Sequence, residues 1–497
     1  MKAIWLGLAA CGGTTSTTLV DTGAVTGDTG PSATDTDTPS TDTGSLDTGI
    51  GDTPPLDSGT TDSEFEPLAR WSGQLQTLSG SYAAERTSTD AGRMLRVADL
   101  DGDGVGDLIV ATRDASPGGG AVVLPGPLDQ DGVLEEVGHV LHNGDLAMAG
   151  AGRTLGAADA TGDGIADLLL GVPYGEPAGA LFAAGPVTDD RDLVNPDARL
   201  LGGIDEYAGH GVDLADVTGD GVADAVVGAP GYDNGRGRVY VLEGPWTASE
   251  VDLTTAQDAL LEGENEGTYM AKNLRAGGDL DGDGVGDFLI PAVYDSIGAP
   301  VSGSVHVVHG PVSGTVDLAD SPGRLVGSDS YDMVGFHLAF GDVNGDGLED
   351  ALIASPRAGG GGDKGATYLV LGPATGLQDL VSESEARWDG TSTDQKVQAG
   401  VESGDVDRDG RDDVLLGAPQ DRTAGRGAGG VFLFYGPVEG VHPVADAEAW
   451  ILGREESAEL GQGVAVGDLG GGPGADLALG AVGGTGTVFS LLDPEGP

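Results

Sequence analysis

The chain has 497 residues, including 91 glycines, and its 81 acidic side chains outnumber 23 basic ones to give a net charge of −58. This charge repels nucleic-acid phosphates and anionic membrane surfaces, so we expect neither as a direct partner. The glycines follow no three-residue period, which excludes collagen, and the single cysteine, Cys11, excludes an internal disulfide framework. No apolar run reaches the roughly 18 residues that a membrane-spanning helix needs.

The first eleven residues resemble a bacterial lipoprotein signal. Lys2 gives a positive start, residues 3–10 are mostly apolar, and Leu8-Ala9-Ala10-Cys11 resembles a lipobox. The resemblance implies that residues 1–10 are removed and that the thiol of Cys11 is lipidated. The protein would then be anchored to a bacterial outer membrane or cell surface, with the lipid as its only membrane contact. An ordinary signal peptide with an incidental cysteine is the alternative.

Residues 11–66 have a different composition, consisting almost entirely of Thr, Asp, Gly, Ser and Pro. Such a segment cannot bury enough apolar surface to offset the entropy of ordering, and its acidic residues repel one another. We therefore predict a disordered linker over 11–66 and a folded region over 67–497.

One pattern recurs seven times in the folded region, which is typical of a repeat architecture. Its acidic loop begins at 57- to 63-residue intervals, at Asp99, Asp159, Asp216, Asp279, Asp342, Asp405 and Asp468. In the third unit the loop is followed by a short apolar run (DAVVGAP, 224–230), an alternating run (GRVYVLEGP, 237–245) and a last short run (ALLEGE, 259–264). Short apolar runs between glycine and proline clusters predict four strands per unit.

Seven four-stranded units predict an all-β fold, a seven-bladed β-propeller. The last unit lacks its fourth strand, because the chain ends after GTVFSLLDP (486–494). The segment WSGQLQTLS (71–79) stands before the first loop, where a fourth strand would lie. We expect this N-terminal strand to pair with the last blade and close the ring. A single monomeric propeller would then account for residues 67–497.

The recurring loop has the pattern Asp-x-Asp-x-Asp-Gly-x-x-Asp. Acidic side chains at its first, third, fifth and ninth positions can converge on one cation, with the backbone carbonyl of the seventh residue as a further ligand. Hard oxygen ligands in this number favour Ca²⁺ over Zn²⁺ or Cu²⁺. A glycine-rich turn that binds nothing is the alternative, although six near-complete copies argue against it. An EF-hand fits less well, because position twelve of the first copy is Val110 and not glutamate.

The copies differ in their predicted donor sets. The first, fourth and sixth loops have all four acids, the second and third have threonine at position three, and the fifth has asparagine there. The predicted ligands are Asp99, Asp101, Asp103, Val105 and Asp107; Asp159, Thr161, Asp163, Ile165 and Asp167; Asp216, Thr218, Asp220, Val222 and Asp224; Asp279, Asp281, Asp283, Val285 and Asp287; Asp342, Asn344, Asp346, Leu348 and Asp350; and Asp405, Asp407, Asp409, Arg411 and Asp413. The seventh loop has Gly470 and Gly472 in place of two acids, so about six calcium ions are expected.

The repeats resemble FG-GAP repeats, as found in the N-terminal propeller of integrin α subunits. The matching pieces are GDVNGDGLED (341–350) and GDVDRDGRDD (404–413), with VVGAP (226–230) and LLGAP (415–419) after the loops. The resemblance implies calcium in loops on one face of the propeller. It also implies ligand recognition on the opposite face, by the loops that join strand two to three and strand four to the next blade.

Seven of the ten tyrosines fall in these recognition loops: Tyr82, Tyr174, Tyr207, Tyr232, Tyr269, Tyr294 and Tyr331. A tyrosine offers a flat apolar ring and a hydroxyl, which suit a sugar or a protein partner. The alternative is that these rings wedge between blades or cap the central channel.

The sequence favours a calcium-binding, non-catalytic adhesion module for a protein or glycan ligand. It contains neither a G-x-S-x-G elbow nor an HExxH motif, and the paired His306 and His309 should face opposite sides of a strand. A scaffold in a surface complex and a polysaccharide-acting enzyme remain the alternatives. Because propellers host unrelated functions, the adhesion hypothesis rests on the family resemblance.

Overall fold

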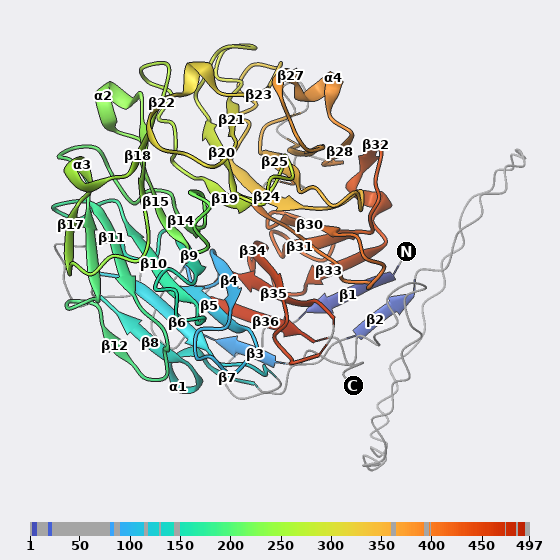
Figure 1. Ribbon diagram of the computed structural model, residues 1–497. Coiled ribbons are helices and arrows are strands. Elements are labelled where there is room, and N and C mark those ends of the chain that lie inside the picture. The colour runs from blue at the N-terminus through green and yellow to red at the C-terminus, as the bar shows by residue number, and fades with distance from the viewer. Residues whose placement is uncertain are drawn as a thin grey trace, which may run out of the picture.

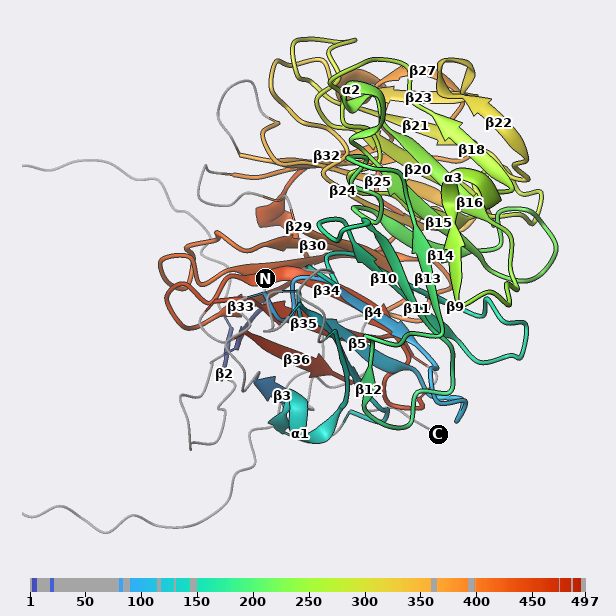
Figure 2. The same cartoon turned by 90° about the vertical axis from the view of Figure 1, so that its left-hand side faces the viewer.

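The computed structural model describes residues 2–6, 18–21, 80–83, 90–113, 118–128, 131–143, 150–358, 364–391, 397, 399–472, 474–483 and 486–492. Seven β-sheets stand around a central axis, and each presents one inner strand to that axis (Figure 1). The same radial arrangement is seen edge-on in Figure 2. The predicted seven-bladed β-propeller is therefore confirmed.

The strands of each blade follow one another outward from the axis, and neighbours are antiparallel. The inner strands are β4 (Leu95–Ala98), β9 (Leu155–Ala158), β14 (Val212–Ala215), β19 (Arg275–Gly278), β24 (His337–Gly341), β29 (Ala399–Gly404) and β34 (Leu460–Gly467). The second strands are β5 (Asp107–Ala111), β10 (Asp167–Val172), β15 (Asp224–Ala229), β20 (Asp287–Ala292), β25 (Asp350–Ser355), β30 (Asp413–Ala418) and β35 (Asp476–Ala481). Every second strand thus begins at the ninth residue of an acidic loop.

The two outer strands complete the predicted set of four. The third strands are β6 (Gly120–Leu124), β11 (Gly179–Ala183), β16 (Arg238–Leu242), β21 (Ser304–Val308), β26 (Ala366–Val370), β31 (Gly430–Phe434) and β36 (Thr487–Leu491). The fourth strands are β8 (His139–His142), β13 (Ala198–Leu201), β18 (Ala259–Glu262), β23 (Gly323–Val326), β28 (Ala386–Asp389), β33 (Ala449–Gly453) and, in the last blade, β3 (Gly80–Ala83).

Each four-stranded blade carries a fifth strand at its outer edge, which the sequence did not predict. In six sheets this strand comes from the next blade and pairs in parallel with the fourth strand: β7 (Gly132–Val133), β12 (Arg191–Asp192), β17 (Glu250–Asp252), β22 (Gly314–Asp317), β27 (Gly376–Asp379) and β32 (Gly440–Pro443). These strands are too short to show an alternating pattern in the sequence. They cover backbone groups that would otherwise form an exposed sheet edge.

Short helical turns follow several of these edge strands. They are α1 (Leu134–Val137), α3 (Leu253–Ala256), η2 (Leu318–Asp320), α4 (Leu380–Glu383) and η3 (Val444–Asp446), and a further turn, α2 (Tyr232–Gly235), lies between β15 and β16. Three of them begin at an aspartate whose side chain accepts a backbone N–H two residues on: Asp252, Asp317 and Asp379. The aspartates cap the exposed amides and end the edge strands.

The N-terminal and C-terminal parts of the propeller are joined in the seventh sheet, where β3 pairs with β36 in an antiparallel arrangement (Figure 1). The segment predicted for this place, residues 71–79, lies outside the described residues. In the sixth sheet, β33 pairs in parallel with β1 (Lys2–Leu6), which also pairs with β2 (Thr18–Asp21). These two strands fall in the expected signal peptide and linker, and removal of residues 1–10 stays a prediction, as does lipidation of Cys11, which lies outside the described residues.

The hydrophobic core lies between neighbouring blades. One cluster, for example, joins Leu169 and Phe182 of the second blade to Val227 and Tyr240 of the third. The second strands consist entirely of buried residues, since each has a neighbouring blade on both faces.

Glycines allow neighbouring blades to approach through their backbones. Gly209, which leads into β14, has a φ of +83°, and a Cβ atom there would lie 1.8 Å from the carbonyl oxygen of Gly179 in β11. Both the backbone conformation and the close contact therefore require glycine.

We expect Gly209→Ala to destabilise the protein by about 2–4 kcal/mol, because it adds a clash to an unfavourable φ. Gly267→Ala is the matched control: its φ is +76°, but a Cβ atom there would meet nothing within 4 Å. It should cost only about 1–2 kcal/mol. Urea unfolding of both variants measures the difference, and equal losses would mean that the close approach of the blades contributes nothing.

Candidate metal centres and ligand face

The ninth-position aspartate of each acidic loop is buried and hydrogen-bonded to the backbone. In the first loop, Asp107 is 1% exposed; its Oδ2 accepts the N–H of Leu100 at 2.8 Å and its Oδ1 accepts that of Gly126 at 3.0 Å. Gly126 lies just after the third strand, so one carboxylate connects the loop to two strands of its blade.

This arrangement recurs around the ring. The carboxylate accepts the N–H of the second loop residue in all seven loops, and that of a glycine after the third strand in the first six. The members are Asp107, Asp167, Asp224, Asp287, Asp350, Asp413 and Asp476. The ninth position therefore has a structural role that does not depend on a metal ion.

The first aspartate of each loop organises the turn itself. Asp99 accepts the N–H of Gly102 through Oδ1 at 2.7 Å and that of Gly104 through Oδ2 at 2.9 Å. Gly102 and Gly104 have φ values of +82° and +88°, which explains why glycine recurs at these two positions. The loop backbone is held in its curled form by its own carboxylate.

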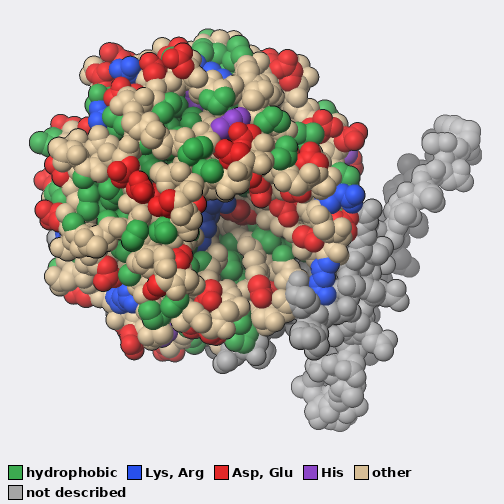
Figure 3. Space-filling model, in the orientation of Figure 1, with side chains coloured by type: hydrophobic (Ala, Val, Ile, Leu, Met, Phe, Trp, Pro, Cys, Tyr) green, Lys and Arg blue, Asp and Glu red, His purple; other side chains and the backbone are tan. Residues whose placement is uncertain are grey.

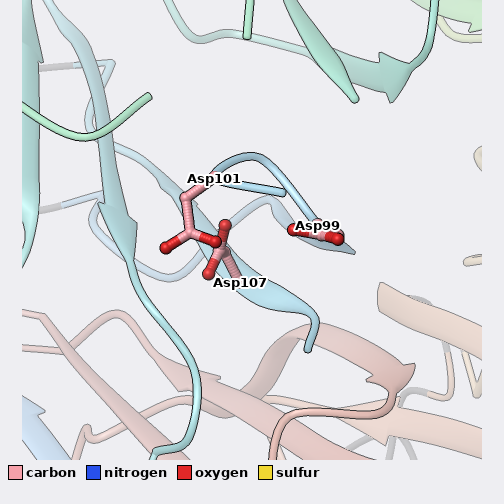
Figure 4. Close-up of side chains that lie close together, drawn as sticks. All are labelled: Asp99, Asp101 and Asp107. Atoms are coloured by element: carbon pink, nitrogen blue, oxygen red, sulfur yellow. The ribbon is translucent and has the colours of Figure 1, made fainter. Parts of the chain in front are cut away.

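In each of three loops, three carboxylates of that loop lie close together. The ligand atoms lie within 4.8 Å of one another in each of three sets: Asp99, Asp101 and Asp107; Asp279, Asp281 and Asp287; and Asp405, Asp407 and Asp413. Figure 4 shows the first set, in which Asp101 and Asp107 lie close together and Asp99 stands on the other arm of the loop. These are the three loops that the sequence singled out as having all four acids.

The fifth-position acid was also predicted as a ligand, but it is not among the three clustered carboxylates. In the first loop, Asp103 Oδ1 accepts the N–H of Val105 at 2.8 Å.

The third position has a neutral side chain in three of the loops. In the loop that begins at Asp342, the side-chain oxygen of Asn344 accepts the N–H of Asp346 at 2.7 Å. In the loop that begins at Asp159, the hydroxyl of Thr161 lies 3.4 Å from Asp159 Oδ1. A neutral oxygen in place of a carboxylate gives these loops a weaker donor set for a divalent cation.

Burial raises the pKa of the ninth-position carboxyls. The pKa rises to about 6 for Asp107 and Asp287 and to about 7 for Asp413, with hydrogen bonds from backbone N–H groups acting in the opposite direction. An all-oxygen site of clustered carboxylates, with this tendency to hold protons, fits a hard divalent cation such as Ca²⁺. The clustered residues would hold the ion and would be neutralised by it.

Adjacent loops contact one another in a ring. The carbonyl of each loop's first aspartate accepts an N–H from the next loop at six of the seven junctions, for example Ala166 to Asp99 at 3.0 Å. The seventh-position side chain packs on the fourth-position glycine of the preceding loop: a Cβ atom at Gly282 would lie 2.7 Å from Leu348 Cδ2. Sequence reasoning assigned these seventh positions, Leu348 among them, only as carbonyl ligands and missed their packing.

Sequence reasoning also missed Arg408, at the fourth position of the sixth loop. The other six loops have glycine there, whereas Arg408 has a φ of +62°. The following loop has Gly474 at its seventh position, so this residue has no side chain to pack against Arg408. Burial raises the pKa of Asp476 to about 7, and the positive charge of Arg408 opposes this. The presence of one arginine at a loop position that is otherwise glycine was the feature of the sequence that could have revealed this contact.

The predicted ligand-face tyrosines lie on connections at the end of the blades opposite the acidic loops. Five of them have exposed side chains: Tyr174, Tyr207, Tyr269, Tyr294 and Tyr331. Tyr232 is half-buried beneath the guanidinium of Arg238, and the side chain of Tyr82 lies outside the described residues. The exposed rings are thus available on the surface.

Tyr207, Tyr269 and Tyr331 occupy equivalent connections and share a positive φ, of 55°, 49° and 69°. A left-handed backbone is uncommon for an aromatic residue and costs on the order of 1–2 kcal/mol. Tyr269 also packs edge-on against Tyr294 of the next blade, with ring centres 6.0 Å apart.

His306 and His309, which are expected to face opposite sides of a strand, have separate partners. His306 is buried with Nδ1 3.2 Å from the hydroxyl of Ser321, whereas His309 Nδ1 lies 3.3 Å from Asp281 Oδ2. Within the described ranges, the three aspartate sets are the groups of His, Cys, Asp or Glu that could hold a metal. No helix in that part of the chain is long and apolar enough to cross a membrane.

Comparison with known proteins supports the repeat assignment. Residues 208–242, 334–370 and 399–434 match the FG-GAP repeat model. Phosphatidylinositol-glycan-specific phospholipase D from Mus musculus is 33% identical over 217 residues, covering 41% of this chain and 25% of the relative. Integrin alpha-PS2 from Drosophila melanogaster is 30% identical over 221 residues, covering 41% of this chain and 15% of the relative.

The chain therefore spans about a quarter or less of the length of these two curated relatives. Among solved structures, the V. cholerae biofilm matrix protein Bap1 is similar over 85% of this chain and 92% of its own, with 14% identity and a TM-score of 0.37.

Two substitutions in the first loop should separate its structural and metal-binding roles. We expect Asp107→Asn to destabilise the protein by about 1–3 kcal/mol with or without calcium, because it disrupts buried backbone hydrogen bonds. Asp101→Asn should leave stability in a chelator nearly unchanged and lower only the calcium-dependent part. Thermal unfolding in calcium and in chelator tests both. A calcium response unaffected by Asp101→Asn would remove the loop as a calcium site.

The raised pKa values predict that calcium binding depends on pH. Without an ion, the protonated carboxyls contribute stability that is present below their ordinary pKa of 3.8 and lost as the pH rises through about 6 to 7. Calcium binds the ionised form, so binding releases protons. The calcium-induced rise in melting temperature should be larger at about pH 8 than at about pH 5. A rise of equal size at both pH values would show that these carboxyls do not take part.

Proposed function

Because this chain is an FG-GAP repeat β-propeller, we propose that it is a calcium-stabilised, non-catalytic binding module that acts outside the cell. The observation that carries this proposal is the set of exposed tyrosines on the connections at one end of the blades, remote from the acidic loops. Exposed aromatic rings on rigidly held connections are typical of surfaces that recognise sugars or proteins. The acidic loops at the other end would keep those connections in place.

The role of calcium in this proposal is structural. Acidic loops are hydrogen-bonded to each other at six of the seven junctions, so an ion bound in one of these loops would also support its neighbour. The three sets of clustered carboxylates are the first sites expected to fill, with the threonine- and asparagine-containing loops filling at higher calcium. Extracellular calcium is abundant enough to fill weak sites, which favours a location outside the cell.

A catalytic function is the second candidate, because the two relatives reported above differ in whether their names describe an enzyme. One relative is named as a phospholipase D and another as an integrin, and this chain covers a small part of each. The carboxylate sets of the described residues all lie in acidic loops, where they accept hydrogen bonds from the loop backbone and could hold a cation. This distribution favours binding over catalysis.

The proposal is tested by probing the full mature protein against an array of glycans and matrix proteins, in calcium and in chelator. We expect calcium-dependent binding that weakens at least about tenfold when Tyr207, Tyr269 and Tyr331 are changed to alanine together. Leu377→Ala is the control, because Leu377 is 66% exposed on the outer strand β27. Binding unchanged by the tyrosine substitutions would refute the ligand face, and release of a GPI-anchored substrate would refute the non-catalytic role.

We also propose the surface anchor implied by the N-terminus. Wild-type protein should remain with the membrane fraction and incorporate labelled fatty acid, whereas Cys11→Ser should do neither. Recovery of both proteins in the same fraction would argue for an ordinary secreted protein.

A further inference from the structure

The central channel of this acidic protein has a basic mouth. The channel wall there is lined by the starts of inner strands, and its charged side chains are Arg93, Arg96, Arg275 and Glu402. Three arginines therefore face one glutamate, although the whole chain has only 23 basic residues against 81 acidic ones. Figure 3 shows blue side chains inside the hollow at the centre of the molecule.

The glutamate is shared between two arginines. Arg275 Nη2 lies 2.8 Å from both carboxylate oxygens of Glu402, and Arg96 Nη1 lies 3.4 Å from one of them. All three side chains are only 16–18% exposed. Glu402 by itself can balance the charge of only one of these two guanidiniums, in a site that is partly shielded from water.

Two further carboxylates, Asp90 and Asp213, offset this charge, and Asp90 is itself shared between two arginines. Arg93 forms an ion pair with Asp90, which Arg113 also contacts. The negative charge of Asp213 stabilises the charged form of Arg96. The carboxylate of Asp213 also accepts hydrogen bonds from the backbone N–H groups of Leu214 and Ala276. The neighbouring charges also act on His337, whose pKa falls to about 4 through burial and the proximity of Arg93, Arg275 and Arg96. His337 is therefore neutral at ordinary pH and adds no positive charge to the channel mouth.

Further basic side chains stand beside the exposed tyrosines around the mouth. Lys272 Nζ lies 5.1 Å from the ring centre of Tyr269 and 4.8 Å from that of Tyr294. Arg153 lies 5.8 Å from the ring centre of Tyr174. Cationic groups thus lie beside flat aromatic faces at two places, an arrangement that suits sugar rings bearing negative charges.

We propose that this channel mouth, defined by Arg93, Arg96, Arg275 and Glu402 with the surrounding tyrosines, binds the carboxylate or sulfate groups of an acidic polysaccharide. The proposal rests on the proposed binding function and names the class of its ligand. The net charge of −58 repels polyanions elsewhere on the protein, so attraction would be confined to this mouth. The bound anion would take the place on Arg96 and Arg275 that Glu402 only partly fills.

The test uses three polymers with the same backbone: carboxymethyl dextran, dextran sulfate and neutral dextran. Titration of the full mature protein in calcium should show binding of at least one charged polymer, weakened by salt, and none of neutral dextran. Preference for one charged polymer identifies carboxylate or sulfate as the recognised group. The double substitution of Arg96→Gln with Arg275→Gln should weaken binding at least tenfold, whereas Arg199→Gln, on the outer strand β13, should not change it.

Glu402→Gln provides a test of opposite sign. Removing the competing carboxylate should tighten binding of the charged polymer several-fold, whereas a purely structural role for Glu402 would weaken it. This variant decides the question if the double arginine variant does not fold, which its thermal unfolding in calcium will show.

Three results would overturn the proposal. They are failure of both charged dextrans to bind, wild-type affinity in the folded double variant, and tighter binding of polyglutamate than of either charged dextran. If the arginine variants bind normally but the tyrosine variants do not, the proposed ligand face stands and the channel mouth is not the site. If the tyrosine substitutions also leave every array signal unchanged, the proposed function fails as well.

Discussion

The fold depends on the buried aspartate that begins the second strand of every blade. Its carboxylate accepts the backbone N–H of the loop's second residue in all seven copies, and in six it also accepts the N–H of a glycine after the third strand. One side chain thus fixes the loop, the second strand and the third strand relative to one another. A buried carboxylate is costly unless it is hydrogen-bonded or paired, so these contacts explain how seven of them are tolerated.

The same carboxylates make the acidic face responsive to cations. Their pKa values are raised by burial, and two more acids stand beside them in three of the loops. A divalent cation would relieve this repulsion at any pH at which it binds, whereas protons relieve it only below about pH 6 to 7. Since neighbouring loops are joined by backbone hydrogen bonds, the stabilisation would pass around the ring, and the opposite face would receive a rigid support for its connections.

The two ends of the channel differ in their charged side chains. The acidic loops gather negative charge at one end, while Arg93, Arg96 and Arg275 gather scarce positive charge at the other. Arginine is suited to this role because its planar guanidinium stays charged when it is partly buried and can engage two oxygens at once. The exposed tyrosines on the surrounding connections extend this surface beyond the channel.

The sequence by itself determined the repeat, the seven blades and the three loops with the richest donor sets, because each depends on residues that recur at a fixed spacing. It did not reveal the fifth edge strand, since a pairing of two to four residues leaves no periodic pattern. It also missed the packing of Leu348 on Gly282, the place of Arg408 beside the seventh loop and the sharing of Glu402 by Arg96 and Arg275. Those contacts join residues of different blades, up to 306 positions apart, and only closure of the ring brings them together.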